Sequence, residues 1–140
     1  MLEHTLIETL VLIKPDAVAA GNFLRIIDYY RTHGLEVVEV RCLVMSRPLA
    51  ENFYAAHRHQ TFYGSLIEFM TSGLVIALRL VSASGVEDSI SRVRFLNGAT
   101  DPSQADESTI RGRYGTTLPC NAVHGSESYD DARRELALIF

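Results

Sequence analysis

Long hydrophobic runs, tryptophan and lysine are what this sequence has least of. No apolar run approaches the roughly 20 residues that a helix needs to span a bilayer. The N-terminus also lacks a basic segment followed by an apolar one, the pattern of a secretory signal. We therefore expect a cytoplasmic protein with no membrane partner.

Cysteine and net positive charge are also scarce. Cys42 and Cys120 have no spacing typical of a metal site or redox pair, and two isolated thiols are more often buried small side chains than a disulfide. The formal net charge of −4 argues against nucleic acid as the primary ligand. An anion must then be bound by a local group of bases. Among the 13 basic residues Lys14 is the one lysine, so a compact ammonium is used there instead of a guanidinium.

The composition that remains is that of an ordinary folded domain. Hydrophobic residues make up 47% of the chain and charged residues 21%, and 140 residues suffice for one substantial core. The sequence has no repeats, linkers or low-complexity segments. A single domain spanning residues 1–140 is expected.

Apolar patterns predict alternating strands and helices after a loose lead-in at Met1–Glu8. The clearest strand is the second, where Val38, Val40, Cys42 and Val44 alternate with other side chains. Strands are expected at Thr9–Ile13, Leu35–Met45, Leu74–Val81 and near Asn121–Val123, and helices at about Gly21–Thr32, Pro48–Arg58, Ser65–Thr71, Ser84–Leu96 and from Ser128 to Phe140. Residues 97–119 show no periodicity, and a loop of that length is usually functional or disordered; its hydroxyl and guanidinium groups favour function.

This order of elements predicts an α+β fold of the ferredoxin-like (split β-α-β) type, with a four-stranded antiparallel sheet covered by helices. We expect the helices on one face of the sheet. In such a fold Lys14, at the end of the first strand, and His124, before the last helix, come within plausible reach of each other.

His124 is the candidate reactive group. Ser128 is a good N-cap for the last helix, so His124 is predicted just ahead of a helix N-terminus, where a phosphate is favoured. A histidine beside an anion can act as acid, base or nucleophile. The local sequence alone also allows a loop histidine with a purely structural role.

Five segments in the same order resemble the nucleoside diphosphate kinase family, and the resemblance runs from about Thr9 to Phe140. These segments are Val11–Ala17 (VLIKPDA), Phe62–Gly64 (FYG), Gly98–Pro102 (GATDP), Thr109–Gly112 (TIRG) and Asn121–Ser126 (NAVHGS). The resemblance implies transfer of the γ-phosphoryl group of a nucleoside triphosphate to a histidine and then to a nucleoside diphosphate, by a ping-pong mechanism with broad base specificity. It also implies Mg²⁺ held mainly by the nucleotide phosphates, with no protein ligand assigned.

The resemblance further assigns roles to individual residues. His124 matches the phosphorylated histidine, and Tyr54 matches a tyrosine beside it. Lys14 and Asn121 match the residues that contact the ribose, with Lys14 also near the phosphates, and Arg94, Thr100 and Arg111 match the phosphate-contacting set. Phe62 matches the aromatic on which the base stacks, Leu118 the apolar residue on the other face of the base, Glu135 the carboxylate that orients the histidine, and Ser126 its hydrogen-bonding neighbour.

Several alternatives stay open. On a helix only one of Arg92 and Arg94 can face the site, and the spacing to Gly98 favours Arg94. Glu135 could instead be a surface carboxylate paired with a base. His57 could touch phosphate, but a helix-surface histidine is the favoured interpretation, and Arg113 is expected to be a solvated loop charge.

Other functions also stay open. A catalytically silent nucleotide-binding protein and a small-ligand regulatory domain of the same fold are the rival functions. The resemblance implies a homo-oligomer, and a tetramer and a hexamer built from dimers are both possible.

Overall fold

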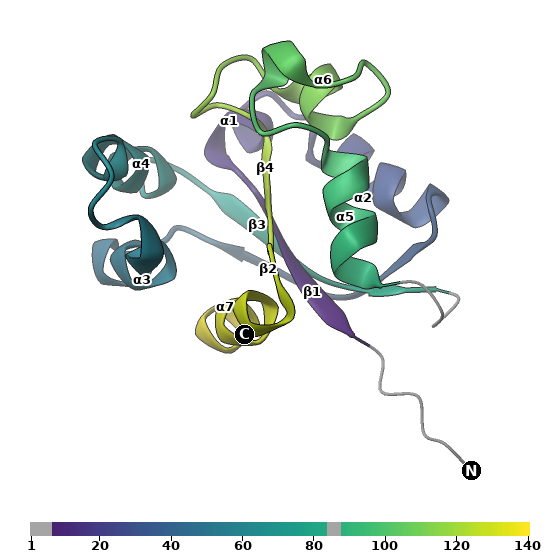
Figure 1. The fold of residues 1–140 in the computed structure, drawn as a ribbon, viewed down its shortest axis with the longest axis horizontal. Helices are drawn as coiled ribbons and strands as arrows, with labels where there is room; N and C mark the ends of the chain where they lie inside the picture. Colours follow the sequence, from purple (N-terminus) through teal and green to yellow (C-terminus); the bar gives the residue numbers. More distant parts are fainter. Residues whose placement is uncertain (1–6, 84–87) are drawn as a thin grey trace.

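Residues 7–83 and 88–140 are described by the computed structural model, whose centre is a four-stranded antiparallel sheet (Figure 1). The strands are β1 (Glu8–Ile13), β2 (Leu35–Leu43), β3 (Val75–Ser82) and β4 (Val123–Gly125), in the order β2-β3-β1-β4. Leu12 of β1 lies opposite Ala77 of β3 on one side and His124 of β4 on the other. The fold class predicted from the sequence is confirmed.

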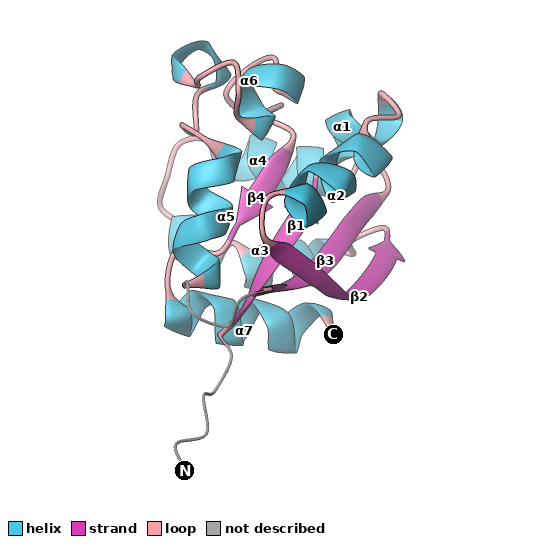
Figure 2. Ribbon diagram, turned by 90° about the vertical axis from the view of Figure 1, so that its right-hand side faces the viewer, coloured by secondary structure: helices cyan, strands magenta, loops and turns pink. Residues whose placement is uncertain are grey.

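Helices pack on both faces of this sheet, as Figures 1 and 2 show. They are α1 (Pro15–Ala19), α2 (Phe23–Thr32), α3 (Arg47–Phe53), α4 (Tyr63–Met70), α5 (Ser89–Asn97), α6 (Ile110–Tyr114) and α7 (Tyr129–Ile139), with 3₁₀ turns η1 (Ala55–His57) and η2 (Pro102–Gln104). The expectation that helices cover one face is therefore wrong. The continuous apolar run of β1 gives the reason: it supplies large side chains to both faces, and each face needs a cover.

Two hydrophobic cores result. Val11 and Ile13 join the core formed with α2, α5 and α6, whereas Leu10 and Leu12 join the core formed with α3, α4 and α7. Both sets of β1 side chains are completely buried. β1 is thus fixed from two sides, and Lys14 follows it directly.

The predicted helix at Gly21–Thr32 is in fact the second of two. Pro15 occupies the first turn of α1, where its missing N–H costs nothing, so the proline starts a helix as well as ending β1. Gly21 has φ +76°, a left-handed conformation that separates α1 from α2. A five-residue helix has too little periodicity to be recognised in the sequence.

Other element boundaries also shift. The helix expected at Pro48–Arg58 ends at Phe53 and continues as η1, the one expected at Ser65–Thr71 spans Tyr63–Met70, and residues 97–119 contain η2 and α6. The helix expected from Ser84 begins at Ser89 with Asp88 as N-cap, and residues 84–87 lie outside the described ranges, as does most of the predicted lead-in.

The edge strand β2 carries a β-bulge between Val37 and Glu39. The bulge reverses which face each side chain uses, so a single alternation does not run through the strand. Val38 and Val40 are about half exposed, and Cys42 is exposed rather than buried. Both cysteines are free thiols, so the preference for isolated thiols over a disulfide is confirmed. The expectation that Cys42 is buried is wrong.

Candidate active site

A cavity of about 390 Å³ opens where the ends of β1 and β4 meet the α3–α4 hairpin and the loop before β4. Its lining includes eight residues that the sequence analysis selected: Lys14, Tyr54, Phe62, Thr100, Arg111, Leu118, Asn121 and His124. A second cavity of about 130 Å³ is lined by Arg94 and shares Thr100 and Arg111 with the first. Nine residues from distant parts of the chain are thereby brought together.

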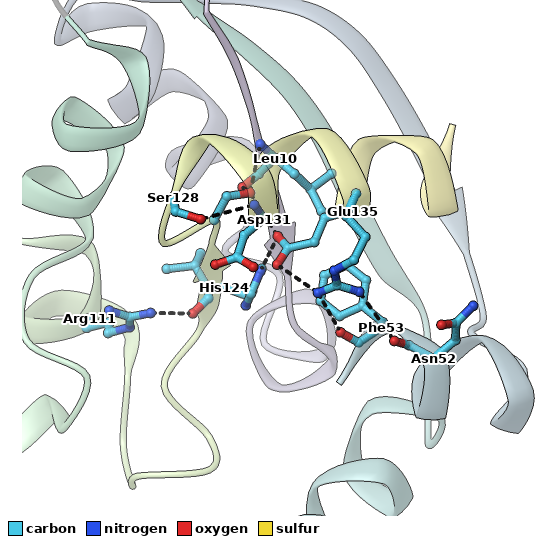
Figure 3. A network of polar contacts seen from close by, with 11 residues as sticks. Leu10, Asn52, Phe53, Arg111, His124, Ser128, Asp131 and Glu135 are labelled. Carbon is cyan, nitrogen blue, oxygen red and sulfur yellow. Dashed lines mark hydrogen bonds and ion pairs between the residues drawn. The ribbon is translucent and has the colours of Figure 1, made fainter. Parts of the chain in front are cut away.

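His124 is held on one side of its ring. Its Nε2 atom lies 2.9 Å from Glu135 Oε1, and the Ser126 hydroxyl donates to the same oxygen at 2.8 Å (Figure 3). Phe53 and Tyr54 contact the imidazole edge to face, with ring centroids 5.0 and 6.0 Å away. Within the described ranges Nδ1 has no hydrogen-bond partner, so this nitrogen is available to contact a ligand in the cavity.

Glu135 is buried on α7 and is therefore not a plain surface carboxylate. The Arg134 guanidinium also lies 3.8 Å from Glu135 Oε2, and Arg134 donates to the carbonyl groups of Asn52 and Phe53. This carboxylate therefore contacts the histidine on one oxygen and a base on the other. The α3 helix is tied to α7 through Arg134.

His124 itself lies in β4, not in a loop at the start of the last helix. Ser128 is the N-cap of α7 as predicted, accepting from the Asp131 N–H at 3.1 Å. Residues of the first turn of α7 line neither cavity. The helix N-terminus that was expected to hold a phosphate therefore lies outside both cavities, and α7 contributes the Glu135 carboxylate from its second turn instead.

Lys14 and Asn121 form a buried polar pair on the cavity wall. Lys14 Nζ donates to Asn121 Oδ1 at 2.8 Å, and Asn121 Nδ2 donates to the Thr100 carbonyl at 2.9 Å. Burial, and after it the nearby Arg111 charge, lowers the pKa of Lys14 to about 8. The pair leaves the ammonium fixed in position with part of its hydrogen-bonding capacity unused.

The backbone between Asn121 and His124 is held in an unusual conformation. Ala122 has φ +75°, which costs a non-glycine residue about 1 kcal/mol or more. Its carbonyl accepts from the Lys14 N–H at 2.8 Å, and its N–H donates to Asp16 Oδ2 at 3.1 Å. Two contacts from the start of α1 therefore set the direction in which the chain enters β4.

Arg111 crosses between the two cavities. Its guanidinium donates to the Gly98 carbonyl at 2.8 Å and to the Val123 carbonyl at 3.0 Å, while Nε is buried without a partner in the described structure. Burial lowers the pKa of Arg111 below its usual range. Arg94 lines the smaller cavity, whereas Arg92 donates to the His33 carbonyl. Of the two arginines on α5, the one favoured by spacing is the one at the cavity.

The outer part of the larger cavity is apolar. Phe62 and Leu118 line it and remain about half exposed. Tyr54 is buried below them; burial raises its pKa above the usual range, and its hydroxyl has no hydrogen-bond partner in the part of the chain described. Arg113 lies away from both cavities and is exposed, as predicted, but it belongs to α6 instead of a loop, and its guanidinium lies over the Tyr29 ring.

Sequence reasoning missed several residues of the site. His57 lines the larger cavity instead of facing solvent alone, Glu127 lines both cavities, and Phe53 packs on His124. Asp16 belongs to a segment that the sequence analysis quoted, but its contact with Ala122 depends on residues 106 positions apart. Of these residues only Asp16 lies within a family-like segment, Val11–Ala17, and that segment gives no sign of the contact with Ala122.

Fold and site together define an α+β protein of ferredoxin-like topology with a carboxylate-held histidine facing a cavity rich in basic side chains. The family model described as "Nucleoside diphosphate kinase" matches residues 8–140. A nucleoside diphosphate kinase of Helicobacter pylori (strain Shi470) is 44% identical over 94% of this chain and 93% of its own length. One from Wolbachia sp. subsp. Drosophila simulans (strain wRi) is 41% identical over 95% and 93%.

Solved structures agree with these sequence comparisons. The nucleoside diphosphate kinase of Aquifex aeolicus superposes with a TM-score of 0.92 at 34% identity, covering 97% of this chain and 96% of its own. The enzyme of Encephalitozoon cuniculi gives a TM-score of 0.89 at 32% identity, covering 95% and 88%. The chain belongs to the nucleoside diphosphate kinase family, as the sequence resemblance predicted.

Proposed function

We propose that the protein transfers the γ-phosphoryl group of a nucleoside triphosphate to a nucleoside diphosphate through phosphorylated His124. The observation that carries the proposal is the 2.9 Å contact between His124 Nε2 and Glu135, on a ring that lines a cavity with Lys14 and Arg111. Because Nε2 is engaged, Nδ1 is the nitrogen whose lone pair attacks phosphorus.

The reaction balances in two halves. First, Nδ1 forms a bond to the γ-phosphorus while the bond from that phosphorus to the β–γ bridging oxygen breaks, and the diphosphate leaves with the electron pair. Then a terminal oxygen of a second diphosphate attacks the phosphorus, the N–P bond breaks, and neutral imidazole returns. Glu135 stabilises the positive charge on the ring during the first half.

Phosphate binding is assigned to the basic side chains of the two cavities. Arg94, Arg111 and Thr100 supply guanidinium and hydroxyl donors to the phosphoryl oxygens, and phosphoryl transfer depends chiefly on such positioning and positive charge. Lys14 and Asn121, already hydrogen-bonded to each other, bind the ribose hydroxyl groups, with Lys14 also near the phosphates.

The base is bound by stacking. Half-exposed Phe62 and Leu118 line the outer cavity, where they can cover the two faces of a flat ring. Every base has a π-face, so stacking discriminates little among them. Broad base specificity is the consequence.

Mg²⁺ is proposed as the cation, bound chiefly by the nucleotide. In the described part of the chain no group of three or more His, Cys, Asp and Glu side chains could hold a metal, and Glu127 is the one acidic residue lining either cavity. A donor set this small fits a metal that arrives with the phosphates, and Glu127 would be the protein carboxylate available to it. When bound, the ion would neutralise phosphate charge.

A homo-oligomer and a cytoplasmic location complete the proposal. Val38 and Val40 of edge strand β2 and Leu24 of α2, which packs against β2, are exposed apolar side chains that a second copy could cover. Among the described residues no helix could span a membrane. The proposed oligomer is a tetramer or a hexamer built from dimers.

The test is exposure of the protein to triphosphate labelled at the γ position. We expect one label per chain that is lost in acid and kept in base, the behaviour of a phosphohistidine, and its release on addition of a nucleoside diphosphate. His124→Ala should fold and acquire no label. A protein that binds nucleotide but never becomes labelled would be the catalytically silent alternative.

A further inference from the structure

Asn97, the last residue of α5, is a buried polar side chain that the mechanism above does not use. The residue is 1% exposed, and it lines the smaller cavity together with Arg94, Thr100 and Arg111. Around it, Val93, Leu96 and Tyr30 belong to one hydrophobic core. A carboxamide at such a position is costly unless its polar atoms are satisfied.

One half of this amide is satisfied by a core tyrosine. The Tyr30 hydroxyl donates to Asn97 Oδ1, and Tyr30 is completely buried. Burial raises the pKa of Tyr30 above its usual range, so the hydroxyl keeps its proton and stays a donor. The hydrogen bond therefore fixes which end of the amide is the acceptor and directs the nitrogen to the opposite side.

The other half has no partner. Nothing within residues 7–83 and 88–140 accepts a hydrogen bond from Asn97 Nδ2. A Cβ placed on Gly125 would lie 2.8 Å from Nδ2, so the amide nitrogen lies against the residue that follows His124. A nine-tenths buried donor thus points at a cavity whose other polar groups are two guanidiniums, a hydroxyl and the Glu127 carboxylate.

We propose that Asn97 donates a hydrogen bond from Nδ2 to a phosphoryl oxygen of the bound nucleoside diphosphate or triphosphate, and that Tyr30 is the positioning residue that orients the amide. The inference rests on the proposed function, since it assigns one more contact in the same site. An uncharged donor adds a directed contact to the phosphate without adding to the charge repulsion among Arg94, Arg111 and Lys14.

Three variants test the pair, with ADP and Mg²⁺ as the ligand and calorimetry as the measurement. Tyr30→Phe frees the amide, Asn97→Leu removes the donor, and Tyr30→Phe/Asn97→Leu removes both. We expect each single variant to weaken ADP binding about three- to tenfold, the range for one hydrogen bond. Tyr114→Phe is the matched control, because Tyr114 packs against the same core and its hydroxyl has no partner in the described structure.

Stability and affinity should respond differently in the double variant. Each single variant leaves a buried polar group unpaired and should lower the melting temperature, whereas the double variant leaves none and should recover it. ADP affinity should stay as low as in Asn97→Leu. A purely structural role would instead restore affinity together with stability.

The outcomes separate this inference from the proposed function. If the wild-type protein transfers phosphoryl groups but Tyr30→Phe and Asn97→Leu bind ADP with unchanged affinity, the inference about Asn97 and Tyr30 is overturned and the proposed function stands. Failure of the wild-type protein to bind ADP would overturn both. Weakened binding in the two single variants and in the double variant, with wild-type binding in Tyr114→Phe, would support it whether or not transfer is observed.

Discussion

The imidazole of His124 is fixed through one nitrogen, and this asymmetry gives the residue its proposed chemistry. Glu135 accepts hydrogen bonds from both His124 and Ser126, so the carboxylate cannot rotate without losing two contacts. Fixing Nε2 determines the tautomer as well as the direction of the ring. In the neutral ring that donates from Nε2, the other nitrogen, Nδ1, carries the lone pair, and it has no hydrogen-bond partner in the described structure.

Glu135→Gln tests this arrangement at the scale of one atom. The amide keeps the shape of the carboxylate but not its charge, so the imidazolium-like state loses its counter-charge. We expect phosphorylation of His124 to slow by about ten- to a hundredfold, by analogy with carboxylates that orient metal-binding histidines. Rapid-mixing measurement of the first half-reaction gives the rate.

Glu68→Gln is the control for that change, because Glu68 is exposed on α4 and undergoes the same loss of charge. It should leave the rate unchanged. A Glu135→Gln protein that is phosphorylated at the wild-type rate would show that the carboxylate is only a structural partner of α7.

The lowered pKa of Lys14 predicts that stability and affinity for ADP change in opposite directions with pH. Its pKa is about 8 in the folded protein and 10.5 ordinarily, so the unfolded chain binds more protons between these values. Stability attributable to Lys14 should therefore rise as pH increases from about 8 to 10.5, while affinity for ADP should fall because the ammonium loses its charge. Denaturant unfolding and ADP titration across this range measure the two trends.

Lys14→Met should remove both trends, and the difference between the two proteins isolates this residue from other groups that titrate at high pH. Equal pH profiles in the two proteins would contradict the assignment of Lys14 to the anion site.

The helices and strands place the site residues, and the short helices α1 and α6 were the hardest elements to predict from the sequence. Lys14, Arg111 and His124 each lie in a short family-like segment, so they could be selected from the sequence without knowledge of the fold. The left-handed turn at Ala122 could not, because it depends on contacts with Lys14 and Asp16 more than 100 positions earlier. Asn97 gave no sequence signal, since its partner Tyr30 belongs to another helix.

Ser128→Ala separates the stability of α7 from catalysis. Loss of the N-cap bond to Asp131 should lower the free energy of unfolding by about 1 kcal/mol. Activity at a temperature where the protein is folded should change little, because the first turn of α7 lines neither cavity. Urea unfolding and a steady-state assay measure the two effects.

Ser46→Ala is a matched change, since Ser46 caps α3 by accepting from the Leu49 N–H at 3.2 Å. The two variants should lose similar stability. A large rise in the KM for nucleotide in Ser128→Ala alone would favour the earlier expectation of a phosphate at the α7 N-terminus.

The whole molecule differs from the sequence-based expectation in its layers. Alternation in β2 predicted a strand correctly but not the bulge. Residues 38–42 are exposed on both faces of this edge strand, so alternation did not predict burial there. Coverage of both faces of the sheet follows from β1, whose apolar run was recognised although its consequence for the helices was not. The exposed valines of this edge strand are the surface assigned to the proposed homo-oligomer.

Val40→Asp tests that surface. Val40 is 51% exposed on the edge strand, so a carboxylate there should be harmless in a monomer and unfavourable against an apolar partner. We expect the wild-type protein to elute as an oligomer and the variant as a smaller species, by light scattering after size exclusion. A monomeric wild-type protein, or an unchanged oligomer in the variant, would contradict the use of this surface.

The most direct test of the whole account is to determine which atom of the protein carries phosphorus after brief exposure to triphosphate. Nuclear magnetic resonance of protein with ¹⁵N-labelled histidine distinguishes the two ring nitrogens. The account predicts one phosphoryl group, on Nδ1 of His124, that disappears when a nucleoside diphosphate is added. Phosphorus on Nε2, on another residue, or on no residue of an active preparation would contradict it.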